Sequence, residues 1–193
     1  MRKGYRCAGD CFLCSDTPSV GTGGSVNGME LRAYQPEDAA VICGWIRSET
    51  ELYRWSADRL GQFPLLPETL QQHYAPKIGR DFIPLTMCTE DGIPAGHLFL
   101  RYPDPADRST VRLGFVIAAP AYRGRGYGRQ LVQLACAYAA QELHAERATL
   151  GVFTENETAL HCYRAAGFRE TGETADIMLA GNAWRCAEMV RIF

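Results

Sequence analysis

The segment 123–129, with the sequence Arg-Gly-Arg-Gly-Tyr-Gly-Arg, constrains the fold of this chain more than any other. It follows an apolar run at 111–117 that is typical of a strand, and it leads into a stretch at 127–143 in which apolar residues recur at helical spacing. Its three glycines let backbone N–H groups turn toward one point, and the beginning of a helix adds the positive end of its dipole. The segment therefore predicts an anion site between a strand and a helix, with three candidate cationic ligands, Arg123, Arg125 and Arg129.

The neighbouring segments predict how this strand and helix are embedded. Two strand-like runs at 82–89 and 93–102 are separated by the turn residues Glu90-Asp91-Gly92, so they should form an antiparallel hairpin. The helix at 127–143 is followed by another strand, which implies one parallel pair. The full prediction has strands at 29–34, 82–89, 93–102, 111–117, 148–153, 168–179 and 184–192, helices at 39–47, 68–74, 127–143 and 155–166, and irregular chain over the rest of 48–78. This is an α/β fold with a mixed sheet.

Length and composition limit the function. The chain has 193 residues, 47% of them hydrophobic, which is enough to bury one core without metals or disulfides. A net charge of −2 gives no global attraction to nucleic acid or to an anionic membrane. The sequence has no run of about 18 apolar residues and no apolar signal segment, so we expect a cytoplasmic protein. A Gly/Ser/Thr-rich stretch at 15–28 predicts a flexible leader over 1–28, followed by a single domain over 29–193.

The eight cysteines fall into two groups. Five of them are scattered through apolar segments, where a reduced thiol behaves as a small hydrophobic group: Cys43, Cys88, Cys136, Cys162 and Cys186. The other three, Cys7, Cys11 and Cys14, form C-x3-C-x2-C, which is similar to the iron–sulfur motif of radical S-adenosylmethionine enzymes and could also supply zinc ligands. Those enzymes build their motif into a barrel of repeated strand–helix units, whereas here the cysteines precede the Gly/Ser/Thr-rich stretch at 15–28. We therefore expect no metal and keep a metal-binding protein as an alternative.

The anion site alone fits several classes of protein. A dinucleotide-binding loop follows the first strand of a parallel unit, whereas a hairpin precedes this one, and the Gly-Lys-Ser/Thr of a P-loop is absent from the sequence. Arg123-x-x-Gly126-x-Gly128 instead resembles the signature R/Q-x-x-G-x-G/A of the GCN5-related N-acetyltransferase (GNAT) family. Downstream, Asn156-x-x-Ala159-x-x-x-Tyr163-x-x-x-Gly167-Phe168 resembles the second motif of that family. The resemblance extends over about 29–193 and is sharpest at 113–168.

The resemblance implies a fold, a co-substrate and a set of site residues. The sheet would be mostly antiparallel, twisted, flanked by helices and splayed where acetyl-CoA enters. A primary amine would attack the acetyl group directly in a ternary complex, and Tyr163 would act as general acid for the departing thiolate. The resemblance assigns the pantetheine arm to the backbone of Val116, Ile117 and Ala118 and to Asn156, and the pyrophosphate to Arg123, Gly124, Arg125, Gly126, Tyr127, Gly128 and Arg129.

The general base and the acceptor stay open. Some relatives carry a glutamate five residues before the asparagine of the second motif, but this chain has Gly151 there. An ordered-water relay ranks first as the base, ahead of Glu49, Glu51, His97, Glu155 and Glu188. The acceptor, a small-molecule or peptide amine, would lie against the aromatic segment 48–78 and Trp184, and a homodimer is possible. A non-catalytic acyl-CoA-binding module is the alternative function, and the presence of Tyr163 favours an enzyme.

Overall fold

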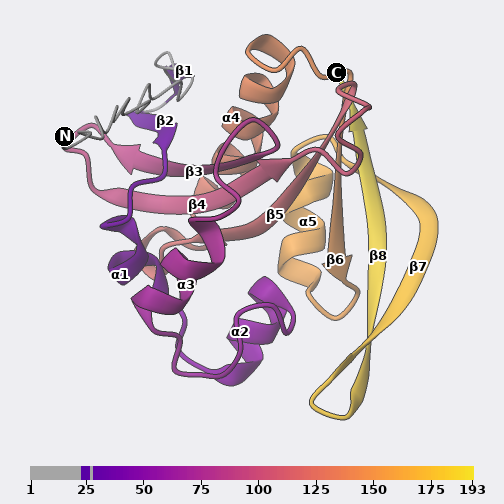
Figure 1. Ribbon diagram of the computed structural model, residues 1–193. Helices are drawn as coiled ribbons and strands as arrows, with labels where there is room; N and C mark the ends of the chain where they lie inside the picture. Colours follow the sequence, from indigo (N-terminus) through magenta and orange to yellow (C-terminus); the bar gives the residue numbers. More distant parts are fainter. Residues whose placement is uncertain (1–22, 27) are drawn as a thin grey trace, which may run out of the picture.

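The computed structural model describes residues 23–26 and 28–193, and Figure 1 shows its arrangement. In this part of the chain, eight strands form one sheet in the order β1-β2-β3-β4-β5-β6-β8-β7. The strands are β1 (Gly23–Val26), β2 (Met29–Ala33), β3 (Phe82–Thr89), β4 (Pro94–Arg101), β5 (Thr110–Ala118), β6 (Arg147–Phe153), β7 (Arg169–Leu179) and β8 (Asn182–Ile192). The helices are α1 (Asp38–Cys43), α2 (Glu49–Ser56), α3 (Pro67–Tyr74), α4 (Tyr127–Gln141) and α5 (Glu157–Ala165), with a 3₁₀ turn at Pro120–Tyr122.

The sheet is mixed, as the sequence predicts. β5 and β6 pair in parallel because α4 forms the crossover between them, and every other pair of neighbouring strands that the structure describes is antiparallel. The predicted hairpin at 82–102 is present as β3 and β4. β1 lies at the edge of the sheet, within the stretch that the sequence assigns to a leader, while Cys7, Cys11 and Cys14 lie outside the described residues.

Both faces of the sheet are covered by helices, because successive side chains of a strand point to opposite faces. On β4, Leu98 and Leu100 belong to the core that packs against α4 and α5, whereas Phe99 belongs to the core beneath α1, α2 and α3. Figure 1 shows the same division, with α1, α2 and α3 gathered in one group. None of the helices in the described residues combines the length and the apolar composition that crossing a membrane requires.

The helix predicted at 39–47 ends too late, and the helix that follows it was not predicted from the sequence. The structure ends α1 at Cys43, with Gly44 as the C-cap, and begins α2 at Glu49 in a stretch predicted to be irregular. The sequence carries the signal for α2, because the Ser48 side chain accepts a hydrogen bond from the Glu51 N–H and Glu51 in turn accepts one from the Arg47 N–H. This capping pattern is what the prediction overlooked.

A buried carboxylate ties α1 to the sheet. Asp38, 3% exposed, accepts hydrogen bonds from both terminal nitrogens of Arg32 at 2.7 Å, from the Gln35 N–H at 2.9 Å and from the Thr86 hydroxyl at 2.8 Å. Burial by itself raises the pKa of this carboxyl, but the hydrogen bonds from Arg32, Gln35 and Thr86 outweigh it and hold the pKa below its usual value. The ionised form of Asp38 therefore stabilises the fold.

We expect Asp38→Asn to lower the free energy of unfolding by about 3 kcal/mol at pH 7, because Arg32 loses its buried partner. The native pKa is depressed, so the stabilisation is present above the unfolded value of about 4 and is lost as the pH falls through the native value. Urea unfolding at several pH values measures both effects. Asp81→Asn, which removes a surface ion pair with Arg108, is the control and should cost less than about 1 kcal/mol. Equal losses for the two variants would contradict the assignment.

Candidate active site

The parallel pair β5–β6 opens partway along its length. Its register covers 110–112 on β5 and 147–149 on β6, yet β5 continues to Ala118 and β6 to Phe153. Beyond the last paired residues the two strands diverge and leave a wedge between them. Residues 113–118 and 150–153 line cavities in this wedge. The splayed sheet that the resemblance implies is therefore present.

A β-bulge shapes the β5 side of the wedge. His97 on β4 pairs with Ile117, but Phe99, two residues on, pairs with Gly114, so β5 carries one extra residue here. Phe115 has a positive φ of 52°, which is uncommon for a residue with a side chain. The indole N–H of Trp55 on α2 donates a hydrogen bond of 2.6 Å to the Phe115 carbonyl. Trp55 thereby fixes the backbone of β5 where it leaves β6.

The glycine-rich segment forms an open cradle at the beginning of α4. Gly124 and Gly126 have φ values of 72° and 86°, and no atom lies within 4 Å of the position of a Cβ on either residue. Gly126 is the N-cap, and the first helical hydrogen bond runs from the Gln130 N–H to the Gly126 carbonyl at 3.0 Å. The N–H groups at 127–129 therefore have no acceptor within the helix. Such groups are suited to an anion.

A cavity of about 570 Å³ joins this cradle to the wedge. It collects most of the residues that the sequence assigns to the cofactor and the catalytic site. They are Val116, Ile117, Ala118, Arg123, Gly124, Gly126, Gly128, Arg129, Asn156 and Tyr163. Arg125 and Tyr127 do not line it, and the Arg125 guanidinium instead lies 5.5 Å from the centroid of the Tyr127 ring. The roles of all these residues toward a cofactor stay predictions.

Arg123 holds the cavity wall together. Its guanidinium donates hydrogen bonds to the carbonyls of Ala118 and Trp45 and forms an ion pair of 3.3 Å with Glu51. These contacts connect the end of β5 with α2 and the loop before it. The side chain is 41% exposed, so the guanidinium also stays accessible from the cavity.

α5 contributes Asn156 and Tyr163. Asn156 is its N-cap, where the side-chain oxygen accepts a hydrogen bond of 3.2 Å from the Ala159 N–H. Tyr163 is 8% exposed, and its hydroxyl forms no hydrogen bond to any other residue that the structure describes. Burial raises the pKa of the Tyr163 phenol well above its usual value, so the group stays protonated at neutral pH. The Tyr163 side chain lines the cavity.

The predicted base candidates are engaged elsewhere. His97 is fully buried, 2.8 Å from the Tyr74 hydroxyl, and burial lowers its pKa to about 3. Glu49 accepts a hydrogen bond from Tyr53, and Glu51 pairs with Arg123. Both carboxylate oxygens of Glu188 contact Arg112, and Glu155 is exposed outside both cavities. None of these side chains presents a free carboxylate or imidazole to Tyr163.

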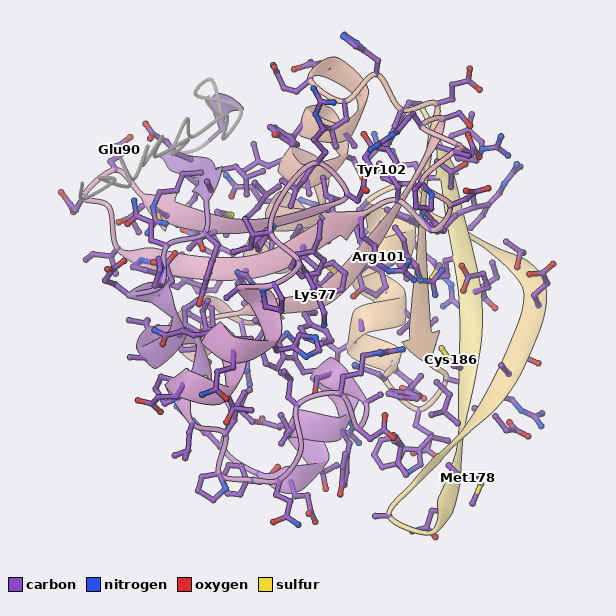
Figure 2. The ribbon with its side chains drawn as sticks, viewed as in Figure 1. Lys77, Glu90, Arg101, Tyr102, Met178 and Cys186 are labelled. Carbon is purple, nitrogen blue, oxygen red and sulfur yellow. The ribbon has the colours of Figure 1, made fainter. Side chains whose placement is uncertain are left out.

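A second cavity of about 210 Å³ lies on the other side of the wedge. The two cavities meet at the predicted general acid, because they share six lining residues: Arg54, Trp55, Val116, Asn156, Ala159 and Tyr163. Sequence reasoning missed the most unusual lining residues of the second cavity, the four arginines Arg54, Arg59, Arg101 and Arg112. Arg101 and Cys186, which also lines this cavity, are labelled in Figure 2.

The aromatic residues predicted to face the acceptor are distributed differently. Trp55 lines both cavities, whereas Tyr74 is fully buried among Tyr34, Phe82 and His97. Trp184 packs with Tyr53 and Phe153 in a small separate core. In the described part of the chain, no three His, Cys, Asp or Glu side chains come together as metal ligands would.

The sequence profile of the Acetyltransferase (GNAT) family matches residues 45–168. The chain belongs to the GNAT family. The sequence-based prediction of the family is confirmed, and membership makes the chain an acetyl-CoA-dependent N-acetyltransferase.

Individual relatives of this acetyltransferase support the same assignment. The spermidine N(1)-acetyltransferase of Escherichia coli K12 is 27% identical over 170 residues, which are 88% of each chain. An N-acetyltransferase 9-like protein of Nematostella vectensis is 31% identical over 80 residues, and this match spans 42% of the present chain and 40% of that relative's length. A crystal structure of the Vibrio cholerae spermidine N-acetyltransferase with CoA and spermine aligns with a TM-score of 0.73 at 20% identity, covering 86% and 96% of the two chains. The predicted fold class is confirmed.

The bulge of this acetyltransferase depends on Gly114, since a Cβ at that position would overlap the ring of Phe99. We expect Gly114→Ala to cost about 1–3 kcal/mol of stability through overpacking. Phe99→Leu lacks the three overlapping ring atoms, so in that background Gly114→Ala should cost less than half as much. Urea unfolding of the four proteins of this double-mutant cycle measures the coupling. The same cost in both backgrounds would show that the Phe99 ring does not impose the glycine.

Proposed function

We propose that this GNAT enzyme transfers the acetyl group of acetyl-CoA to a primary amine by direct attack in a ternary complex, with Tyr163 as general acid. The observation that carries the proposal is the meeting of two cavities at Tyr163, inside the wedge between β5 and β6. One cavity leads to the glycine cradle and the other leads away from it. This arrangement gives a donor and an acceptor separate entrances and a shared point of reaction.

The larger cavity fits the donor. The backbone of Ile117 and Ala118 pairs with β4 on one side, and the segment 116–118 lines the cavity in the wedge. We expect this segment to hydrogen-bond an extended pantetheine arm. The N–H groups at 127–129 and the side chain of Arg129 would hold the pyrophosphate at the beginning of α4. Space is available at Gly124 and Gly126, where nothing lies within 4 Å of a Cβ position.

Acetyl transfer requires the protein to place the two substrates correctly and to supply one proton. The neutral amine forms the new C–N bond as the C–S bond breaks, and backbone N–H groups of β5 stabilise the charge on the carbonyl oxygen. Tyr163 donates its phenolic proton to the departing thiolate sulfur and is reprotonated from solvent. An ordered-water relay accepts the proton of the amine, since the side chains considered as bases are engaged elsewhere.

The proposal also covers the localisation and the oligomeric state of the protein. We place it in the cytoplasm, consistent with the sequence and with the class of its relatives. A dodecameric structure of the Vibrio cholerae spermidine N-acetyltransferase, with a TM-score of 0.66, supports self-association of this chain as well. Light scattering after size-exclusion chromatography would give the number of subunits.

Gly126→Glu should abolish acetyl-CoA binding in isothermal titration calorimetry, because a carboxylate would fill and repel the pyrophosphate cradle. Gly92→Glu is a matched control, since Gly92 also has a positive φ (77°) and open space around it but lies in the β3–β4 turn. The control should bind acetyl-CoA like the wild type. Unchanged binding by Gly126→Glu would rule out the cradle.

Tyr163→Phe should lower kcat by about 100-fold or more with a competent amine while KM for acetyl-CoA changes little, because the thiolate loses its proton donor. Tyr138→Phe is the control, since Tyr138 is another buried tyrosine that lines neither cavity. Steady-state assays of thiol release measure both variants. If the two substitutions have equal effects, Tyr163 is structural and is not the general acid.

A further inference from the structure

The smaller cavity is cationic. Four arginines line it, Arg54, Arg59, Arg101 and Arg112, and none of the described residues in its lining is an aspartate or a glutamate. The chain as a whole carries a net charge of −2, so this concentration of positive charge is local. A cavity built in this way attracts anions and repels polycations.

Two of the arginines face each other across neighbouring strands. Arg101 on β4 and Arg112 on β5 are direct partners in the antiparallel register, so their side chains leave the sheet on the same face. Like charges at such a pair destabilise a sheet. Glu188 neutralises Arg112 through a bidentate contact, and Arg101 has no equivalent partner in the described part of the chain. The charge of Glu188 also acts on Arg101 and offsets part of this repulsion. Like charges that stay together with only partial compensation are typical of a functional site.

The other two arginines are also free of carboxylates. None of the ion pairs in the described part of the chain includes Arg54, Arg59 or Arg101. Burial, and then the charges of Arg112 and Arg59, lower the pKa of the Arg101 guanidinium, and the charge of Glu188 opposes them less strongly. These groups therefore share one electrostatic neighbourhood. Within the described residues, Arg54, Arg59 and Arg101 therefore form no ion pair and are available to an anion.

Gly151 lines the cavity beside Arg112. A Cβ at this position would lie 2.9 Å from a terminal nitrogen of Arg112 and 2.9 Å from the Cys186 sulfur, so a side chain there would press against both. The cavity reaches from Arg101 and Arg112 at the paired part of β4 and β5 to Tyr163 in the wedge. An acceptor bound here would have one end at the arginines and the other at the general acid.

We propose that the acceptor is a small primary amine that also carries an anionic group, a carboxylate or a phosphate, and that Arg101 and Arg59 bind this group while the amine points toward Tyr163. The inference rests on the proposed acetyl transfer and specifies its substrate class. It separates this chain from the polyamine class in the names of its relatives, because spermidine brings several positive charges into a cavity that is already positive.

The test uses the purified full chain, saturating acetyl-CoA and matched amines in an assay of thiol release. The pairs are phosphoethanolamine with ethanolamine and L-alanine with L-alaninamide, and spermidine is assayed beside them. We expect kcat/KM to be at least about 10-fold higher for the anionic member of one pair, which also identifies phosphate or carboxylate as the recognised group. A preference for spermidine or for the members without an anionic group overturns the inference.

Arg101→Gln separates anion recognition from general damage. It should lower kcat/KM for the anionic amine by about 10-fold or more, mainly through KM, and abolish the preference within the pair. Arg101→Lys should retain part of the preference for the anionic amine. Arg169 is an exposed arginine of β7 outside the cavity, so Arg169→Gln should leave kcat/KM and the preference unchanged. Acetyl-CoA affinity by calorimetry should stay at the wild-type value in all three. A preference that survives Arg101→Gln overturns the assignment.

The two proposals fail in different ways. If acetyl-CoA does not bind and no amine is acetylated, the proposed function and this inference are both wrong. If acetyl-CoA binds and amines are acetylated without preference for an anionic group, the transferase proposal stands and the cationic cavity is not the acceptor site.

Discussion

The site depends on how long β5 stays paired with β6. The parallel register covers 110–112 and then ends, because the bulge at Phe115 redirects β5 while β6 continues to Phe153. Trp55 holds the Phe115 carbonyl from α2, and Gly114 provides the space that the Phe99 ring needs. One local irregularity thus opens the sheet, creates both cavities and frees a stretch of strand backbone for hydrogen bonds to a ligand.

The structural features that the sequence predicted correctly are those determined by residues close together in the chain. The turn at 123–129 between β5 and α4 depends on glycine geometry and on the beginning of a helix, both of which lie within a few residues of one another. Its role as an anion site stays a prediction. The hairpin and the crossover helix followed from periodicity and turn residues. The missed helix α2 was predictable by the same logic, since Ser48 and Glu51 form a recognisable cap. It was overlooked because proline and aromatic residues nearby suggested irregular chain.

The cationic cavity could not have been predicted in this way. Arg54 and Arg59 come from α2 and the loop after it, whereas Arg101 and Arg112 come from two strands far along the chain. Their meeting depends on the β4–β5 register and on the packing of α2 against β5, which no local pattern encodes. An arginine in a sequence is usually an exposed, solvated side chain. The tertiary fold brings four arginines together in the lining of one cavity.

The positive cavity also bears on the question of the general base. Acetyl transfer needs the neutral amine, and a nearby positive charge lowers the pKa of an ammonium group by disfavouring its charged form. Near Arg54, which lines both cavities together with Tyr163, the amine of the acceptor would give up its proton more readily than it does in water. A carboxylate base is then less necessary, because water can accept the proton. The presence of Gly151 in place of a glutamate and the unpaired arginines are in this view two parts of one arrangement, in which the electrostatics of the cavity replace a dedicated base.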